Sequence, residues 1–209
     1  MKRGLSNPWF FITLCLAVPI TAFTTLKWYS RNFEKLPVYG KSENLAITSL
    51  HNQDNSPAYE PKGKIKIVNF FFTHCPVICV KMTKNMKVAH DMYLNDPSVA
   101  FMSFTVDPAR DSVQRLREYI RKRKIDDKNW QFLTGDKKII YALARNQFQL
   151  VASGGDGSDN DFIHSEKLVL LDAENRIRGY YTGTNEDEIK QLITDIKKLK
   201  HESSNFLTQ

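Results

Sequence analysis

Two cysteines, at the junction between a strand-like run and a helix-compatible segment, constrain this chain more than any other feature. Residues 65–72 are apolar and rich in β-branched and aromatic side chains, which is typical of a strand buried on both faces. Cys75 follows, and Pro76 suits the first position of a helix, because a missing N–H costs nothing there. The pattern predicts Cys75 at the mouth of a helix and Cys79 one turn inside it.

The C-x-x-x-C spacing of Cys75 and Cys79 is one residue longer than the C-x-x-C redox spacing. Residues i and i+4 share a helix face, so both sulfurs are expected to point the same way. Unpaired N–H groups at a helix start favour thiolate over thiol. The pair therefore suits a soft metal or a reversible disulfide. Two buried cysteines that act only as small apolar side chains are the simpler alternative.

A metal would need a third ligand, because two sulfurs alone do not satisfy most metals. His164 is the candidate: it follows a Gly/Asp-rich loop at residues 153–160 and precedes a predicted strand. If the cysteine strand belongs to a sheet that closes with a hairpin, the loop before that hairpin is expected close to the cysteine helix. A histidine that only satisfies local hydrogen bonds is the competing interpretation. His74 adjoins the motif, but at a strand end its side chain is free to point away.

The N-terminus carries a second strong pattern. A short basic tail, residues 1–8, precedes eighteen uncharged residues, 9–26, which is near the minimum of about 17–25 residues for a membrane span. Trp9 and the Trp28-Tyr29 pair flank it, as interfacial aromatic residues do. A cleaved signal peptide is the alternative, but the apolar run is long for one and no clear Ala-x-Ala site precedes Lys27. We expect an uncleaved anchor and a tether at residues 27–35.

Between residues 36 and 201 the pattern predicts one α/β domain, followed by a flexible tail at 202–209. Alternating strands and helices argue for parallel pairing with helices on both faces. A closing antiparallel hairpin and a terminal helix, after cysteines at the first strand–helix junction, match a thioredoxin-like plan with a mixed sheet. The expected strands are 65–72, 99–106, 131–134, 167–171 and 176–181, and the expected helices include 137–145 and one that Thr184 caps.

The charge does not indicate a nucleic-acid-binding protein. The formal net charge is +7, but the basic residues are spread along the chain, with one dense run at residues 121–124 that closes a predicted helix. No zinc-finger or RNP-type pattern accompanies it. A basic helix end is favoured by the helix dipole, and the alternative is steering of an acidic protein or an anionic membrane.

Three motifs, in order, resemble the Sco/SenC family of membrane-anchored copper chaperones. They are Phe72-Thr73-x-Cys75-Pro76-x-x-Cys79, Val106-Asp107-Pro108-x-x-Asp111 and Asp161-x-x-His164-Ser165. The resemblance covers about residues 36–200. Two positions depart from it: the family usually has proline where this chain has Val80, and Thr-Pro where it has Ser112-Val113. Neither removes a ligand, so the departures bear on subgroup and partner.

The resemblance implies a thioredoxin-like domain that binds one copper ion, Cu(I) or Cu(II), through Cys75, Cys79 and His164. It also implies a role in cytochrome c oxidase assembly, in which the protein delivers copper to the Cu(A) site or keeps the thiols of that site reduced. The implied partner is the oxidase subunit that carries the Cu(A) site, or alternatively another copper protein. Such a metallochaperone is not a classical enzyme. Thiolates select Cu(I), and an added imidazole makes a set that can also hold Cu(II). Asp107 is a candidate for orienting a ligand, or it merely shapes a turn before Pro108.

Two other functions use the same residues. A thiol–disulfide oxidoreductase would use Cys75 as the attacking thiolate and Cys79 as the resolving one, and a redox or copper sensor would signal through a partner. The short N-terminal tail and the cysteine chemistry both favour a domain outside the cytoplasm. No Arg/Ser-rich transit peptide precedes the anchor, so a bacterial inner membrane, with a single span and a periplasmic domain, is expected.

Overall fold

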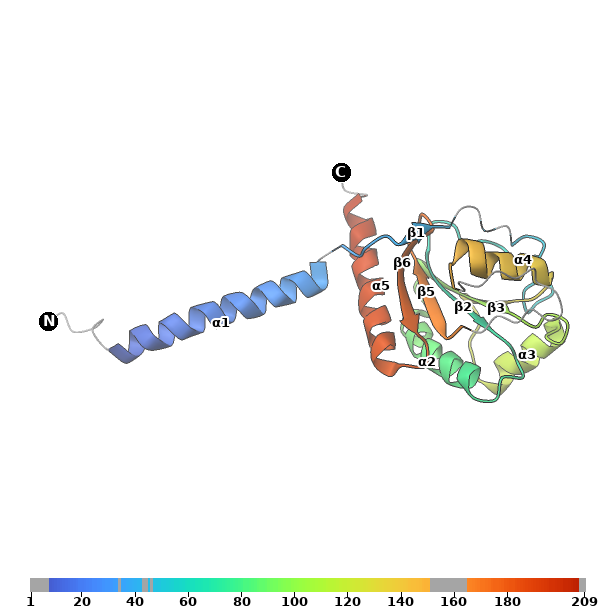
Figure 1. Cartoon of the computed structure of the whole chain (residues 1–209), viewed down its shortest axis with the longest axis horizontal. Helices are drawn as coiled ribbons and strands as arrows, with labels where there is room; N and C mark the ends of the chain where they lie inside the picture. The colour runs from blue at the N-terminus through green and yellow to red at the C-terminus, as the bar shows by residue number, and fades with distance from the viewer. Residues whose placement is uncertain (1–7, 34, 43–44, 46, 151–164, 207–209) are drawn as a thin grey trace. The chain divides into compact units, whose positions relative to one another are not determined.

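The computed structural model describes residues 8–33, 35–42, 45, 47–150 and 165–206 of the chain. The chain folds as two compact units, Met1–Lys35 and Leu36–Gln209. The first unit contains the helix α1, and the second contains all the strands and the remaining helices (Figure 1).

The second unit is built on a six-stranded mixed sheet with the order β1-β6-β5-β2-β3-β4. The central strand β2 pairs in parallel with β3, which pairs in parallel with β4, while β5, β6 and β1 add antiparallel pairings. This confirms the predicted mixed sheet with a closing hairpin. The strands are β1 Gly40–Lys41, β2 Ile65–Phe71, β3 Val99–Thr105, β4 Trp130–Leu133, β5 Lys167–Leu171 and β6 Arg176–Thr182.

Helices cover both faces of this sheet. One hydrophobic cluster joins it to α2, α3 and α5, and a second joins the opposite face to α4. The helices are α1 Pro8–Phe33, α2 Ile78–Tyr93, α3 Val113–Lys122, α4 Lys137–Ala142 with a π-helical continuation at Leu143–Gln147, and α5 Glu186–Phe206. In Figure 1 the label α4 lies across the sheet from α2 and α5.

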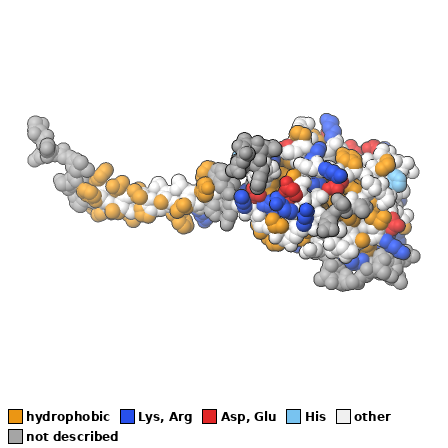
Figure 2. All heavy atoms as spheres, turned by 90° about the horizontal axis from the view of Figure 1, so that it is seen from above, with side chains coloured by type: hydrophobic (Ala, Val, Ile, Leu, Met, Phe, Trp, Pro, Cys, Tyr) orange, Lys and Arg blue, Asp and Glu red, His pale blue; other side chains and the backbone are white. Residues whose placement is uncertain are grey.

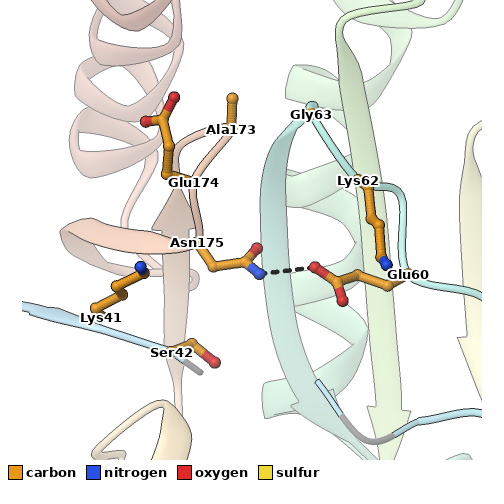
Figure 3. A pocket seen from close by; sticks show the side chains of 8 residues that line it. All are labelled: Lys41, Ser42, Glu60, Lys62, Gly63, Ala173, Glu174 and Asn175. Atoms are coloured by element: carbon orange, nitrogen blue, oxygen red, sulfur yellow. Dashed lines mark hydrogen bonds between the residues drawn. The ribbon is translucent and has the colours of Figure 1, made fainter. Parts of the chain in front are cut away.

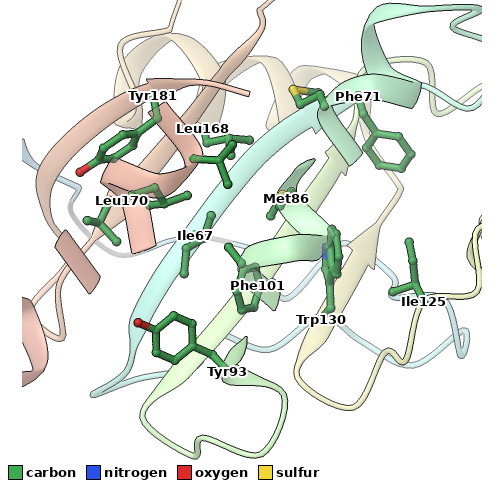
Figure 4. Packing of buried hydrophobic residues seen from close by; sticks show 14 of the residues in the cluster. Ile67, Phe71, Met86, Tyr93, Phe101, Ile125, Trp130, Leu168, Leu170 and Tyr181 are labelled. Carbon is green, nitrogen blue, oxygen red and sulfur yellow. The ribbon is translucent and has the colours of Figure 1, made fainter. Parts of the chain in front are cut away.

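Strand β2 is buried along its whole length, as its apolar sequence predicts. Ile67 and Phe71 belong to the cluster under α2, whereas Val68 and Phe70 belong to the cluster under α4. This division follows from the period of two in a strand, which sends successive side chains to opposite faces. Figure 4 shows the first cluster, in which Met86 lies among Ile67, Phe101 and Trp130. Met86 is therefore a core residue.

Several element boundaries differ from the sequence expectation. Helix α2 begins at Ile78, so Pro76 lies before the helix rather than at its first position. The α5 cap is Asn185, whose side-chain oxygen accepts a hydrogen bond from the Asp187 N–H at 2.9 Å. Thr184 instead donates its hydroxyl to Glu166 at 2.5 Å. These shifts arise because side-chain hydrogen bonds at neighbouring positions compete for the same cap.

Helix α5 also continues to Phe206, past the point where a flexible tail was expected. Glu202 explains the extension: its carboxylate accepts hydrogen bonds from Arg178 Nη2 at 2.7 Å and from the Leu36 N–H at 3.0 Å. Arg178, only 4% exposed, also donates to the Leu36 carbonyl and to Asp172. We call Arg178, Glu202 and Asp172 the tether clamp, because they hold the first residue of the domain.

Helix α1 is long and apolar enough to cross a membrane. Its span Trp9–Tyr29 has a mean hydropathy of 1.9, and apolar side chains follow its length in Figure 2. Each of Thr13, Thr21, Thr24 and Thr25 donates its hydroxyl to the carbonyl four residues earlier, at 2.7–2.9 Å. Hydroxyls satisfied within the helix do not need water, which suits a lipid environment.

Candidate metal centre

Cys75 and Cys79 lie together where strand β2 passes into α2. Between them Pro76 and Val77 lie in a bend and α2 begins at Ile78, and the Cys79 N–H, in the first turn of α2, donates to Cys75 Sγ at 3.1 Å. The Cys75 sulfur thus serves as a cap that Val77, with no side-chain hydrogen bond to the helix, cannot supply. The two thiols are adjacent, as predicted, through a different local geometry.

The thiols are more buried than a helix mouth suggests. Cys75 is 9% exposed and Cys79 5%. Burial, followed by the hydrogen bond with Cys75, raises the pKa of the Cys79 thiol to about 12. The expectation that the helix start would favour thiolate is therefore wrong for Cys79, because desolvation of a charged sulfur outweighs the helix dipole. Copper or an attacking base must displace a proton to use this sulfur.

A pocket of about 370 Å³ opens onto the two cysteines. Apolar side chains from the end of β2 and the start of α2, and Val106 after β3, form most of its lining. Ser165 and Glu166 close another part of the same pocket. Two segments far apart in the sequence therefore meet at the cysteines.

His164, the expected third ligand, lies outside the described residues. Its chain neighbours, however, are held at the pocket: the Glu166 carbonyl accepts a hydrogen bond from the Gly183 N–H at 2.7 Å. Gly183 packs against α2 so closely that an added Cβ would lie 2.5 Å from Met82 Cγ, and its carbonyl accepts from Asn85 Nδ2 at 3.0 Å. These contacts hold Glu166 and Gly183 beside α2.

Within the described residues, no group of three His, Cys, Asp or Glu side chains could hold a metal ion. His74 is half exposed, and its Nδ1 lies 3.2 Å from Thr73 Oγ1. His90 is a buried residue of α2. Its Nε2 lies 2.8 Å from Asn129 Oδ1, and burial lowers its pKa. His164 stays the predicted third ligand.

Asp107, a candidate for orienting a ligand, makes its contacts away from the sulfurs. Its carboxylate lies 3.7 Å from Arg110 Nη1. Its N–H donates to Thr105 Oγ1, and its carbonyl accepts from the Asp111 N–H at 2.9 Å. These bonds shape the turn after β3, which is the role that the simpler interpretation gave it.

Asp111 is the residue that sequence reasoning missed. Ser112 rather than Asp111 caps α3, and the Asp111 carboxylate is fully buried. It accepts the Thr73 N–H at 2.9 Å and hydroxyls of Thr73 and Thr105 at 2.5 and 2.6 Å. Thr73 stands two residues before Cys75, so Asp111 ties the cysteine turn to the end of β3. The motif Asp-Pro-x-x-Asp contained the signal, but one of the two partner threonines, Thr73, lies 38 residues away in the sequence.

A second hollow, of about 510 Å³, lies between the turns that precede β2 and join β5 to β6 (Figure 3). Glu60 and Glu174 lie in it beside Lys41 and Lys62, and Asn175 donates to Glu60 at 2.6 Å. None of the predicted site residues lines it. Charged side chains of both signs line this hollow, whereas the lining of the cysteine pocket is mostly apolar.

Comparison with known proteins agrees with the motifs. The SCO1/SenC family profile matches residues 49–201. A curated relative, the SCO1 protein homolog of Bacillus subtilis (strain 168), is 28% identical over 153 residues, which cover 71% of this chain and 79% of the relative. The chain spans about half the length of mitochondrial relatives from Mus musculus and Arabidopsis thaliana, at 54% and 46%.

Solved structures show the same architecture. A SCO1/SenC family lipoprotein from Bacillus anthracis str. Ames superposes with a TM-score of 0.63 at 28% identity, covering 81% of this chain and 96% of that one. Arabidopsis thaliana ScoI with copper bound gives a TM-score of 0.58 at 27% identity, covering 75% of this chain and 99% of that one.

Proposed function

Because this chain belongs to the SCO1/SenC family, we propose that it is a membrane-anchored copper chaperone for cytochrome c oxidase assembly. It binds one copper ion as cargo through Cys75, Cys79 and His164, and it delivers copper to the Cu(A) site or keeps the thiols of that site reduced. The observation that carries the proposal is the shared pocket, which Cys75, Cys79 and Ser165, the neighbour of His164, all line.

The chemistry of the donors supports copper. Two thiolates suit Cu(I), and one imidazole added to them also accommodates Cu(II). Most of the pocket lining is apolar, so beside the sulfurs it offers few of the oxygen ligands that harder metals prefer. A solved relative at 27% identity holds copper, and the Sco family to which BsSco belongs is one of cytochrome c oxidase assembly proteins. Thiols must lose protons to bind metal, so the affinity rises with pH.

The remaining residues support the ligands. Asp111 holds the turn that carries Cys75, through Thr73. Asp107 acts indirectly, because its carbonyl accepts the Asp111 N–H. The hydrogen bond between the Gly183 N–H and the Glu166 carbonyl holds residue 166, two positions after His164, at the pocket. The site is thus assembled from β2–α2, β3–α3 and the segment before β5.

The location follows from α1 and from the chemistry. Helix α1 provides a single membrane span near the N-terminus. We place the domain on the periplasmic side of a bacterial inner membrane, because copper exchange on thiols suits a compartment outside the cytoplasm.

Replacing His164 tests this function. His164→Ala is expected to abolish or weaken Cu(II) binding by at least about a hundredfold and to remove the thiolate-to-copper visible absorption band, because one of three ligands is lost. His51→Ala is the matched control, since His51 is exposed and distant in sequence from the motifs. The readouts are copper stoichiometry, affinity and the absorption spectrum. Unchanged binding in His164→Ala would refute the proposed site.

A second function is favoured by the hydrogen bond that joins the two cysteines. In thiol–disulfide exchange, Cys75 would attack a substrate disulfide, and Cys79 would displace the reduced substrate while the two form a disulfide. The substrate gains two electrons and two protons as the pair loses them. This activity needs no histidine, so reductase activity that survives His164→Ala but not Cys75→Ser would identify it.

A further inference from the structure

Three aliphatic side chains stand exposed at the mouth of the cysteine pocket. Val77 is 67% exposed, Ile78 45% and Val80 36%. Val77 and Ile78 also belong to the pocket lining. Contiguous apolar exposure of this kind marks an interaction surface more often than scattered single residues do. We call these three residues the mouth patch.

Two lysines continue this surface along α2. Lys81 and Lys84 are exposed and follow Val77 by four and seven residues, so the three share one helix face. Within the part of the chain that the structure describes, neither ammonium group has a hydrogen bond or an ion pair. The next lysine, Lys87, is by contrast paired with Asp91 at 2.6 Å. Two unneutralised positive charges therefore adjoin an apolar patch.

We propose that the mouth patch, Lys81 and Lys84 form the docking surface for the copper-exchanging protein, whose facing surface is apolar at its centre and acidic at its rim. The inference rests on the proposed function. To exchange copper, a partner must bring its own ligand to the sulfurs, and the route into the pocket passes Val77 and Ile78. Burial of these side chains removes water from the exchange site. The lysines attract carboxylates and so speed and orient the encounter.

An anionic membrane would also attract lysines and aliphatic side chains. The position of the patch favours a protein instead, because its residues wall a concave pocket that a metal ligand must enter. A flat lipid surface gains nothing from that pocket. The membrane is therefore an alternative outcome for the test rather than a second proposal.

The first test reverses the charges. Full-length copper-loaded protein in nanodiscs is mixed with the isolated, copper-free Cu(A) domain of cytochrome c oxidase, and the transfer rate is followed by absorption at several salt concentrations. Lys81→Glu/Lys84→Glu is expected to slow transfer about tenfold at low salt and to flatten its salt dependence. The control Lys138→Glu/Lys197→Glu makes the same charge change at exposed sites on α4 and α5 and should retain the wild-type rate.

The second test removes apolar surface without charge. Val80→Ser is expected to slow transfer while the copper affinity stays the same, because Val80 is 36% exposed and does not line the cysteine pocket. Val38→Ser, at 55% exposure in the segment before β1, is the matched control. Circular dichroism and copper stoichiometry confirm that each variant folds and loads.

The outcomes separate this inference from the proposed function. Copper binding with wild-type transfer rates in both α2 variants would overturn the docking surface and leave the chaperone function standing. Wild-type binding to the Cu(A) domain without copper transfer, weakened by the α2 variants, would support the surface and refute delivery. Unchanged transfer with weaker binding of the variants to anionic vesicles would overturn the docking surface in favour of the membrane.

Discussion

A single buried carboxylate, Asp111, holds the turn that presents Cys75. Its oxygens accept three hydrogen bonds from Thr73 and Thr105, and no lysine or arginine neutralises it among the contacts of the described residues. Buried ionised groups persist only where hydrogen bonds replace water. The carboxylate therefore couples the geometry of the cysteine turn to the stability of the domain.

We predict that Asp111→Asn destabilises the domain by about 2–3 kcal/mol, because an amide cannot accept all three charge-assisted hydrogen bonds and presents its own donors to the threonines. The variant should also bind copper more weakly. Chemical denaturation and copper titration measure the two effects.

Asp107→Asn serves as the control for Asp111. The Asp107 carboxylate pairs only with the 73% exposed Arg110, so its loss should cost less than about 1 kcal/mol. Equal effects of the two substitutions on stability would contradict the special role of Asp111.

At the scale of elements, periodicity identified every strand of the central sheet except β1. The long apolar runs at residues 65–72 and 99–106 became β2 and β3 to within one residue. The two-residue strand β1 carries no periodic signal, and it exists because Gly40 and Lys41 pair with β6.

The candidate site was less accessible to sequence reasoning than the fold. The cysteine spacing indicated adjacent sulfurs, and the structure confirms this. The turn geometry depends on a sulfur cap and on Asp111, which are tertiary contacts without a local pattern. Burial of Cys79 likewise results from packing of the whole pocket, so its raised pKa could not follow from the helix-start argument.

A buried histidine of α2, His90, packs against the sheet, and its burial makes the stability of the domain depend on pH. His90 packs between Phe101 and Trp130, with ring centroids 5.1 and 5.0 Å away. Burial lowers its pKa below 6.5 despite the nearby Asp91. Below this pH the unfolded chain takes up a proton that the folded chain resists, so stability falls as pH falls.

We predict that His90→Gln removes this dependence. The stability of wild type relative to the variant should decrease between pH 7.5 and 5.5, by up to about 1.4 kcal/mol per pH unit. Urea unfolding of residues 36–209 at both pH values measures the difference, and groups shared by the two proteins cancel. A difference that stays constant with pH would show that His90 does not titrate in this way.

For the whole molecule, the two units should be separable. The domain has its own hydrophobic clusters on both sheet faces, so residues 36–206 are expected to fold without α1. Shortening this fragment to 36–201 removes Glu202 and leaves the buried Arg178 and the Leu36 N–H without that partner.

We predict that the 36–201 fragment is less stable than 36–206 by about 3 kcal/mol, because one member of a buried ion pair is lost. Glu202→Gln in the longer fragment should reproduce most of the loss, which separates the ion pair from the shortened helix. Thermal unfolding measures both. Equal stability of the two fragments would show that the tether clamp does not stabilise the domain.

The tether clamp has a consequence for how the protein searches for its acceptor. Leu36 is held, so only residues 34 and 35 separate the domain from the last residue of α1, Phe33. Fully extended, the chain between Phe33 and Leu36 spans roughly 10 Å at most. With α1 in the bilayer, as proposed, the domain cannot diffuse away from the membrane surface. Its search becomes nearly two-dimensional, which raises its effective concentration toward an acceptor embedded in the same membrane.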